Sequence, residues 1–140
     1  MVLSGASGLL TDEAIQRLLQ KQPPVAAGPL EAALRPAAVL VPLVWFNNQW
    51  HLLFTRRTET VNSHKGQVSF PGGAADPEDH SPETTALREA YEEIGLRSED
   101  VRVLGRLAAY ATVSSFLITP VVGQVRWPNQ FHISPQEVSR

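Results

Sequence analysis

The chain has 140 residues, which is the length of one ordinary domain and too short for two independent cores. Hydrophobic residues make up 43% of it and charged residues 19%, and the formal net charge is −2. This balance is typical of a soluble globular protein and provides no positive field that would gather nucleic acid. We therefore expect a small-molecule partner.

No cysteine is present, which excludes a disulfide framework, a thiolate nucleophile and a cysteine zinc site. Any metal must be held by oxygen or imidazole ligands. The N-terminus has no basic residues before its short apolar stretch, and no run of 18 apolar residues occurs, so neither a signal peptide nor a membrane span is indicated. We expect a cytoplasmic protein with no membrane partner.

The N-terminal part predicts a short helix and a linker. Thr11 can cap an amphipathic helix in which apolar residues fall at helical spacing, namely Ile15, Leu18 and Leu19. Helix-breaking residues follow it, namely Pro23, Pro24, Gly28 and Pro29. We expect residues 1–35 to be an appendage of helix and stiff Pro-rich linker, attached to one domain over residues 36–140.

An apolar run over residues 37–46 predicts the first strand of a β-hairpin. Asn47-Asn48 makes the turn, and residues 49–56 supply the second strand. Because Pro42 cannot donate a ladder hydrogen bond, we expect its strand to be an edge strand or to carry a bulge.

Three later segments also have strand composition, namely residues 68–70, 101–108 and 116–125. The first of them is followed by Pro71-Gly72-Gly73, which predicts a tight turn. Residues 131–133 could begin another strand, and the chain stops soon afterwards.

The middle of the chain predicts a helix with clear ends. Ser81 can serve as the N-cap, and Pro82 suits the first helical position. The helix should run to about Ile94, with Gly95 as its stop.

Two faces of this helix carry different chemistry. An apolar stripe that should pack against the sheet consists of Leu87, Ala90, Tyr91 and Ile94. A second face carries Glu89, Glu92 and Glu93, which repel one another by a few tenths of a kcal/mol per pair. Arg88 relieves part of this repulsion through an i,i+4 contact with Glu92. A divalent cation would relieve more, since Mg²⁺ and Mn²⁺ favour oxygen ligands.

The same acidic cluster can also be an ordinary solvated face, which is the commoner arrangement on a surface helix. The Gly72-Gly73 backbone favours a site, because a chain without Cβ atoms permits close approach to a metal or a phosphate. The histidines lack a metal-ligand spacing, and we expect His51, in an apolar strand, to be structural.

Gly72-Gly73 followed by residues 88–96, REAYEEIGL, resembles the sequence box that defines Nudix hydrolases. The second half of the box is matched at every position. In the first half, Gly73 lies one residue further from Arg88 than is usual, and His80 occupies the position of the first glutamate.

The lengthened box is similar to that of the coenzyme A pyrophosphatase branch of the family. Residues 53–73 resemble the same branch, since an arginine after the first hairpin and a His-x-Gly-Gln stretch recur there and are matched by Arg57 and residues 64–67. A basic residue often found shortly before the histidine is missing. Residues 118–123, ITPVVG, also resemble this branch, and the similar segments together cover roughly residues 39–139.

The resemblance implies an α/β fold, the Nudix-type α/β/α sandwich around a mixed β-sheet, with the helix of residues 86–94 on one face. The chain ends before the C-terminal helix that would cover the other face. We therefore expect exposed apolar surface there, or contact with a second copy in a homodimer.

The resemblance also implies roles for individual residues. Glu92 and Glu93 would bind Mg²⁺ or Mn²⁺ with the carbonyl of Gly72, while Glu89 binds metal or deprotonates the attacking water. Arg88 would hold a glutamate in orientation. Residues expected to contact substrate are Arg56, Arg57, His64, Lys65 and Gly73. Glu137 is a candidate for an extra carboxylate from outside the box.

The implied reaction is hydrolysis of a phosphoanhydride bond, with coenzyme A or acyl-CoA yielding 4′-phosphopantetheine, or its acyl form, and adenosine 3′,5′-bisphosphate. One alternative is a Nudix pyrophosphohydrolase acting on ADP-ribose, NADH or a nucleoside triphosphate, because the same helix serves all of these substrates. The other is a non-catalytic Nudix-like binding module, motivated by His80 and the short C-terminus.

Overall fold

A computed structural model describes residues 2–7, 10–21, 33–57, 68–128 and 138–139. The predicted linker after the first helix, the polar loop of residues 58–67 and the segment of residues 131–133 lie outside these ranges. Within the described part, no helix is long and apolar enough to cross a membrane.

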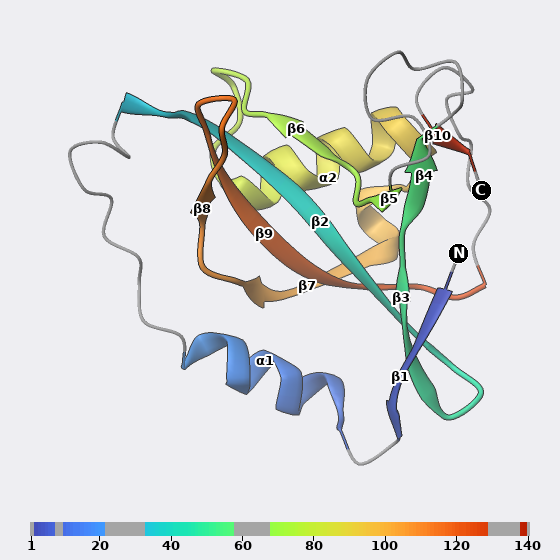
Figure 1. Cartoon of the computed structure of the whole chain (residues 1–140). Coiled ribbons are helices and arrows are strands. Elements are labelled where there is room, and N and C mark those ends of the chain that lie inside the picture. The colour runs from blue at the N-terminus through green and yellow to red at the C-terminus, as the bar shows by residue number, and fades with distance from the viewer. Residues whose placement is uncertain (1, 8–9, 22–32, 58–67, 129–137, 140) are drawn as a thin grey trace.

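A seven-stranded mixed sheet forms the centre of the molecule (Figure 1). Its main path has the order β1-β3-β2-β9-β7, with β6 paired to β2 and β8 paired to β9. The bounds are β1 (Val2–Ser7), β2 (Arg35–Phe46), β3 (Gln49–Leu53), β6 (Gly72–Ala74), β7 (Val101–Arg106), β8 (Tyr110–Ala111) and β9 (Phe116–Val125). The β2 and β9 strands run parallel and the other pairs are antiparallel, so the expected α/β class with a mixed sheet is confirmed.

A second, smaller sheet contains β10 (Val138–Ser139), β4 (Thr55–Arg57) and β5 (Val68–Ser69), in the order β10-β4-β5. Residues 68–69 are therefore the short strand that the sequence predicted. The pairing of β10 with β4 brings Val138 and Ser139 beside Arg57 and Arg56, which are far from them in the sequence.

The predicted hairpin is confirmed as β2 and β3, which pair from Leu43↔Leu52 to Phe46↔Gln49. The second strand is shorter than predicted, because β3 ends at Leu53 and residues 55–56 belong to β4 of the smaller sheet. Its turn residues Asn47 and Asn48 have φ values of 52° and 59°. A two-residue hairpin of this kind needs positive φ at both central positions, and asparagine tolerates that conformation better than most residues.

The prediction that Pro42 marks an edge strand or a bulge was wrong, because β2 is a central strand. Along the side of β2 that faces away from β9, β6 pairs as far as Val39 and β3 pairs only from Leu43. The amide of Leu40 points to this side, where it donates to the Pro71 carbonyl. Amides two residues apart in a strand point the same way, so the missing N–H of Pro42 falls in the gap between β6 and β3.

The predicted tight turn at residues 71–73 was also wrong, because Gly72 and Gly73 belong to strand β6. Gly72 pairs with Val39, and a Cβ on it would lie 2.4 Å from the carbonyl oxygen of Ala38. Glycine is needed here for close approach of two backbones rather than for a turn.

Helix α2 (Pro82–Ile94) begins and ends as predicted. The Ser81 side chain accepts from the Thr84 amide, and Gly95 ends the helix with φ 70° and its N–H on the Ala90 and Tyr91 carbonyls. The apolar stripe needs one correction, since Tyr91 is 61% exposed. Ala86 lies at 0% exposure instead, one turn before the buried Ala90, so the packed face is centred further from Tyr91 than the spacing suggested.

The core between α2 and the sheet consists of Ala38, Leu40, Val44, Ala86, Ala90, Ile94, Leu96, Val121 and Val125. Leu96 lies between α2 and the short helix η2 (Ser98–Asp100), which leads into β7. Side chains of a strand alternate between faces, and Val41 and Leu43 of β2 accordingly belong to a different core on the other side.

That other face is covered by α1 (Asp12–Gln20), which is the predicted N-terminal helix (Figure 1). The expectation that this helix is an appendage was therefore wrong. The apolar surface expected to be exposed opposite α2 is covered in part, and Trp45 of β2 on this face is still 38% exposed. Ile15 packs there with Trp50, Leu104 and Val122 in a second buried core. The homodimer stays a prediction.

Three contacts fix α1 on this face. The Trp50 indole donates to the Leu10 carbonyl just before the helix, and Arg102 forms an ion pair with Asp12 in its first turn. Gly105 of β7 leaves room for the helix, since a Cβ there would lie 2.7 Å from the Cβ of Leu19. The chain before the helix adds β1, which pairs with β3 at the edge of the sheet.

Candidate functional site

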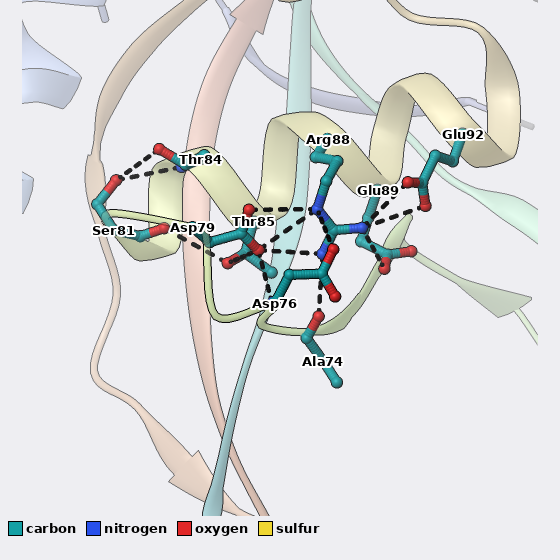
Figure 2. Close-up of polar contacts among 9 residues, drawn as sticks. All are labelled: Ala74, Asp76, Asp79, Ser81, Thr84, Thr85, Arg88, Glu89 and Glu92. Carbon is teal, nitrogen blue, oxygen red and sulfur yellow. Dashed lines mark hydrogen bonds and ion pairs between the residues drawn. The ribbon is translucent and has the colours of Figure 1, made fainter.

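Arg88 on α2 is the centre of a network of carboxylates (Figure 2). Its Nη1 donates to Glu89 Oε1 and to Glu92 Oε1, each at 3.1 Å. Its Nη2 donates to Asp79 Oδ2 and to the Ala74 carbonyl, each at 3.0 Å. The predicted i,i+4 contact with Glu92 is confirmed, and Arg88 also joins the helix to the end of β6.

Asp79 is the residue that sequence reasoning missed. Its carboxylate faces Arg88, whereas the sequence assigned the position of the first box glutamate to His80, counting back from the arginine. His80 is exposed, and its neighbour supplies the carboxylate. Counting forward from Gly73 would have found Asp79, because the usual box places its first glutamate after five intervening residues.

Asp79 is held on its other sides as well. Its Oδ2 accepts from the Thr85 hydroxyl at 2.9 Å and from the Asp76 amide at 2.9 Å. Its side chain is only 5% exposed. The hydrogen bond from Arg88, followed by that from the Asp76 amide, lowers the pKa of Asp79 to about 2, and Asp79 in turn raises the pKa of Arg88.

Glu89 lies between Arg88 and Gly73. Besides its bond to Arg88, it approaches β6 so closely that a Cβ on Gly73 would lie 2.6 Å from its carboxyl carbon. The glycine therefore leaves the space that the Glu89 carboxylate fills. The sequence predicted close approach of a metal or a phosphate to the Gly-Gly backbone, and the group that the structure places near Gly73 is the Glu89 carboxylate.

Glu92 and Glu93 differ in their surroundings. Glu92 is 53% exposed and its two oxygens both accept from Arg88, at 3.1 and 3.2 Å. Glu93 is partly buried. The three glutamates thus share one side of α2, but Arg88 draws two of them toward itself.

The donor set of carboxylate oxygens fits an oxygen-preferring divalent cation in its chemistry. Its arrangement is not yet that of a metal cage. In the described part of the chain, no three His, Asp or Glu side chains are grouped so that they could hold a metal ion. Glu92 would have to turn away from Arg88 to join such a group.

The expected extra carboxylate and most of the expected substrate residues lie where their side chains are not described. His64, Lys65 and Glu137 lie outside the described residues, and only the backbone of Arg56 and Arg57 in β4 is described. That backbone pairs with β5, which leads through Pro71 into Gly72 and Gly73.

His51 is buried at 8% exposure, as a structural residue should be. Its Nε2 lies 3.0 Å from the Phe46 carbonyl, to which it donates, and its ring packs against the Phe46 ring.

The family model described as NUDIX domain matches residues 34–136, which is well over half of the chain. The chain belongs to the Nudix family. A protein from Yersinia enterocolitica named Uncharacterized Nudix hydrolase NudL is 44% identical over 133 residues, which cover 95% of this chain and 67% of that protein. A protein of the same name from Pectobacterium atrosepticum is 49% identical over 105 residues, covering 75% of this chain and 54% of that protein. The Nudix chain thus spans between about half and two thirds of the length of these relatives.

Solved structures agree on the Nudix fold. A complex of the Caenorhabditis elegans Ap4A hydrolase has a TM-score of 0.63 at 18% identity and covers 74% of this chain and 75% of that one. The Nudix domain of Shewanella oneidensis NrtR bound to ADP ribose has a TM-score of 0.55 at 20% identity and covers 88% of this chain and 77% of that one. At these identities the likeness concerns the fold alone.

Proposed function

We propose that this Nudix domain catalyses metal-dependent hydrolysis of a phosphoanhydride bond, with coenzyme A or an acyl-CoA as its substrate. The observation that carries the reaction type is the Arg88 network, which holds Glu89 beside the glycine backbone of β6. The similarity of Arg57, residues 64–67 and the lengthened box to the coenzyme A pyrophosphatase branch supports the substrate.

In this proposal Glu89, Glu92 and Glu93, with the Gly72 carbonyl, hold one or more Mg²⁺ or Mn²⁺ ions. Bound metal lowers the pKa of the attacking water and neutralises charge on the phosphate oxygens. Glu89 either completes the metal site or removes the proton from the water. Because Gly73 has no side chain, the Glu89 carboxylate can lie against β6, where it would reach a substrate bound along this strand.

Arg88 acts by position rather than by contact with substrate. Its Nη1 points Glu89 toward β6, while Asp79 and the Ala74 carbonyl fix the other side of the guanidinium. A preorganised carboxylate avoids the cost of reorientation during the reaction. The phosphate groups of the substrate would contact Arg56, Arg57 and Lys65. His64 would also contact the substrate.

The experiment is a phosphate-product panel at millimolar Mg²⁺ or Mn²⁺ with coenzyme A, acetyl-CoA, ADP-ribose, NADH and a nucleoside triphosphate. We expect hydrolysis of the CoA compounds to exceed that of the others by tenfold or more in kcat/KM. Glu89→Gln should lower kcat by roughly 10²–10⁴, the range for a lost general base.

Preference for ADP-ribose or NADH would contradict the coenzyme A assignment while leaving the reaction type intact. If wild type and Glu89→Gln are equally inactive on every compound, yet one compound binds to both, the non-catalytic binding module is correct instead.

A further inference from the structure

An open cleft of about 370 Å³ lies between the start of β2 and the N-terminus of α2. Its volume falls within the range of small-ligand sites, roughly 300–1,000 Å³. The exposed surface of its lining is mostly apolar, and the lining includes Pro36, Ala75, Pro77 and Pro82 together with His80. Its described lining comes from the start of β2, the loop between β6 and α2 and the first turn of α2, and of these residues only Asp79 has a role in the function proposed above.

The cleft shares a wall with the Arg88 network. Asp76 and Asp79 line it and also contact the Arg88 guanidinium, at 3.4 and 3.0 Å. On the far side of that guanidinium lies Glu89, at 3.1 Å. One guanidinium group therefore separates the cleft wall from the carboxylate at the proposed reaction site, with Asp79 and Glu89 on its two sides (Figure 2).

The charge of this wall decides what the cleft can accept. Around the single positive charge of Arg88 stand four carboxylates, those of Asp76, Asp79, Glu89 and Glu92. A phosphate brought past Asp76 and Asp79 would meet excess negative charge, and among the described residues that line the cleft there is no Lys or Arg side chain. The prolines and Ala75 of the lining would instead favour a ligand whose aliphatic groups are removed from water on binding.

We infer that this cleft, between Pro36, Pro77 and His80, is a specificity subsite for the uncharged arm of the pyrophosphate substrate. Resting on the proposed function, the occupant is the pantetheine or acylpantetheine end of the coenzyme, while the diphosphate stays on the Glu89 side of Arg88. The thioester end of a short acyl chain lies toward the prolines, and the amides of the arm lie toward the polar rim near His80 and Ser81.

Filling the cleft tests this assignment. We expect His80→Trp and Pro77→Trp to raise the KM for coenzyme A and hexanoyl-CoA about tenfold, with kcat less than threefold changed. The KM for any residual ADP-ribose hydrolysis should stay the same, since that compound has no pantetheine arm. The matched control is Glu78→Trp, which adds the same ring to the same loop at an exposed residue outside the lining.

The inference would be overturned if the KM for coenzyme A, relative to wild type, changed equally in His80→Trp, Pro77→Trp and Glu78→Trp. A second measurement does not depend on hydrolysis: amide NMR shifts of wild type titrated with pantetheine alone. We expect amide shift changes confined to Ala75, His80 and their neighbours. The same titration of His80→Trp should show no such changes. No shift at millimolar pantetheine also overturns the inference, whereas cleft shifts without any hydrolysis of coenzyme A would reject the proposed function and retain the subsite.

Discussion

Asp79 and Glu89 contact opposite sides of the Arg88 guanidinium, so a substitution of Asp79 should change the orientation of Glu89 through Arg88. Asp79→Asn removes the charge while nearly keeping the shape. We expect kcat to fall by roughly 10–100-fold with KM little changed, which is the usual effect of losing a group that orients a ligand or catalytic residue. Steady-state kinetics with coenzyme A would measure this, and Glu78→Gln is the control, at the exposed position next to it that lies outside the cleft lining. A similar loss in both variants would mean that Asp79 has no special role.

The acid limit of stability offers a second test of Asp79. Its folded pKa of about 2 lies below the usual 3.8, so the unfolded chain takes up a proton before the folded protein does. The stabilisation from the pair with Arg88 is therefore present above about pH 4 and is lost as the pH falls toward 2. Urea midpoints from pH 5 to pH 2.5 should converge for wild type and Asp79→Asn. A constant difference between them across this range would contradict the ion pair.

The two glycines of β6 make a matched pair. Gly73→Ala places a methyl against the Glu89 carboxylate, a flexible side chain, so activity should fall at least tenfold with little change in the urea midpoint. Gly72→Ala places it 2.4 Å from the backbone carbonyl of Ala38, which cannot yield without moving β2. It should cost about 1–3 kcal/mol of unfolding free energy, as overpacking does. Equal stability of the two variants would contradict these contacts.

The ends of helix α2 are encoded by local sequence signals, and the contribution of its N-cap to stability can be tested by substitution. The Ser81 hydroxyl accepts from the Thr84 amide, so Ser81→Ala should destabilise the protein by about 1 kcal/mol. Ser81→Asp, which can accept the same bond, should restore stability. The chemical denaturation midpoint is the readout, and an unaffected Ser81→Ala variant would show that the cap is not needed.

The α2 helix is also tied to the sheet beyond its core. Glu83 in its first turn forms a two-pronged ion pair with Arg106 of β7, with Nη2 2.8 Å from Oε1. That hydrogen bond lowers the pKa of Glu83. Both side chains are partly exposed, so the pair orients the helix more than it stabilises the protein.

At the scale of the whole molecule, helix α1 packs on the face of the sheet opposite α2. Ile15→Ala should lower the free energy of unfolding by about 2–4 kcal/mol, because Ile15 is the buried residue of α1 that packs with Trp50 and Leu104. Leu18→Ala on the same helix is the control, since Leu18 is 57% exposed and its loss should cost less than about 0.5 kcal/mol. Equal effects of the two would mean that α1 does not cover the sheet as described.

The sequence by itself determined the elements whose signals are local. The caps at Ser81 and Gly95, the Asn47-Asn48 hairpin turn and the Arg88–Glu92 spacing depend on residues a few positions apart, and all were predicted correctly. The family followed from the same kind of signal, since the box is nearly continuous along the chain.

Only the tertiary structure decided the features that depend on which strand or helix lies opposite. Pro42 is tolerated in a central strand because the pairing changes beside it from β6 to β3. Helix α1 covers the sheet because the opposite face offers Trp50, Leu104 and the space at Gly105. These contacts join residues far apart in the sequence, and the spacing of side chains along one segment carries no information about its partner.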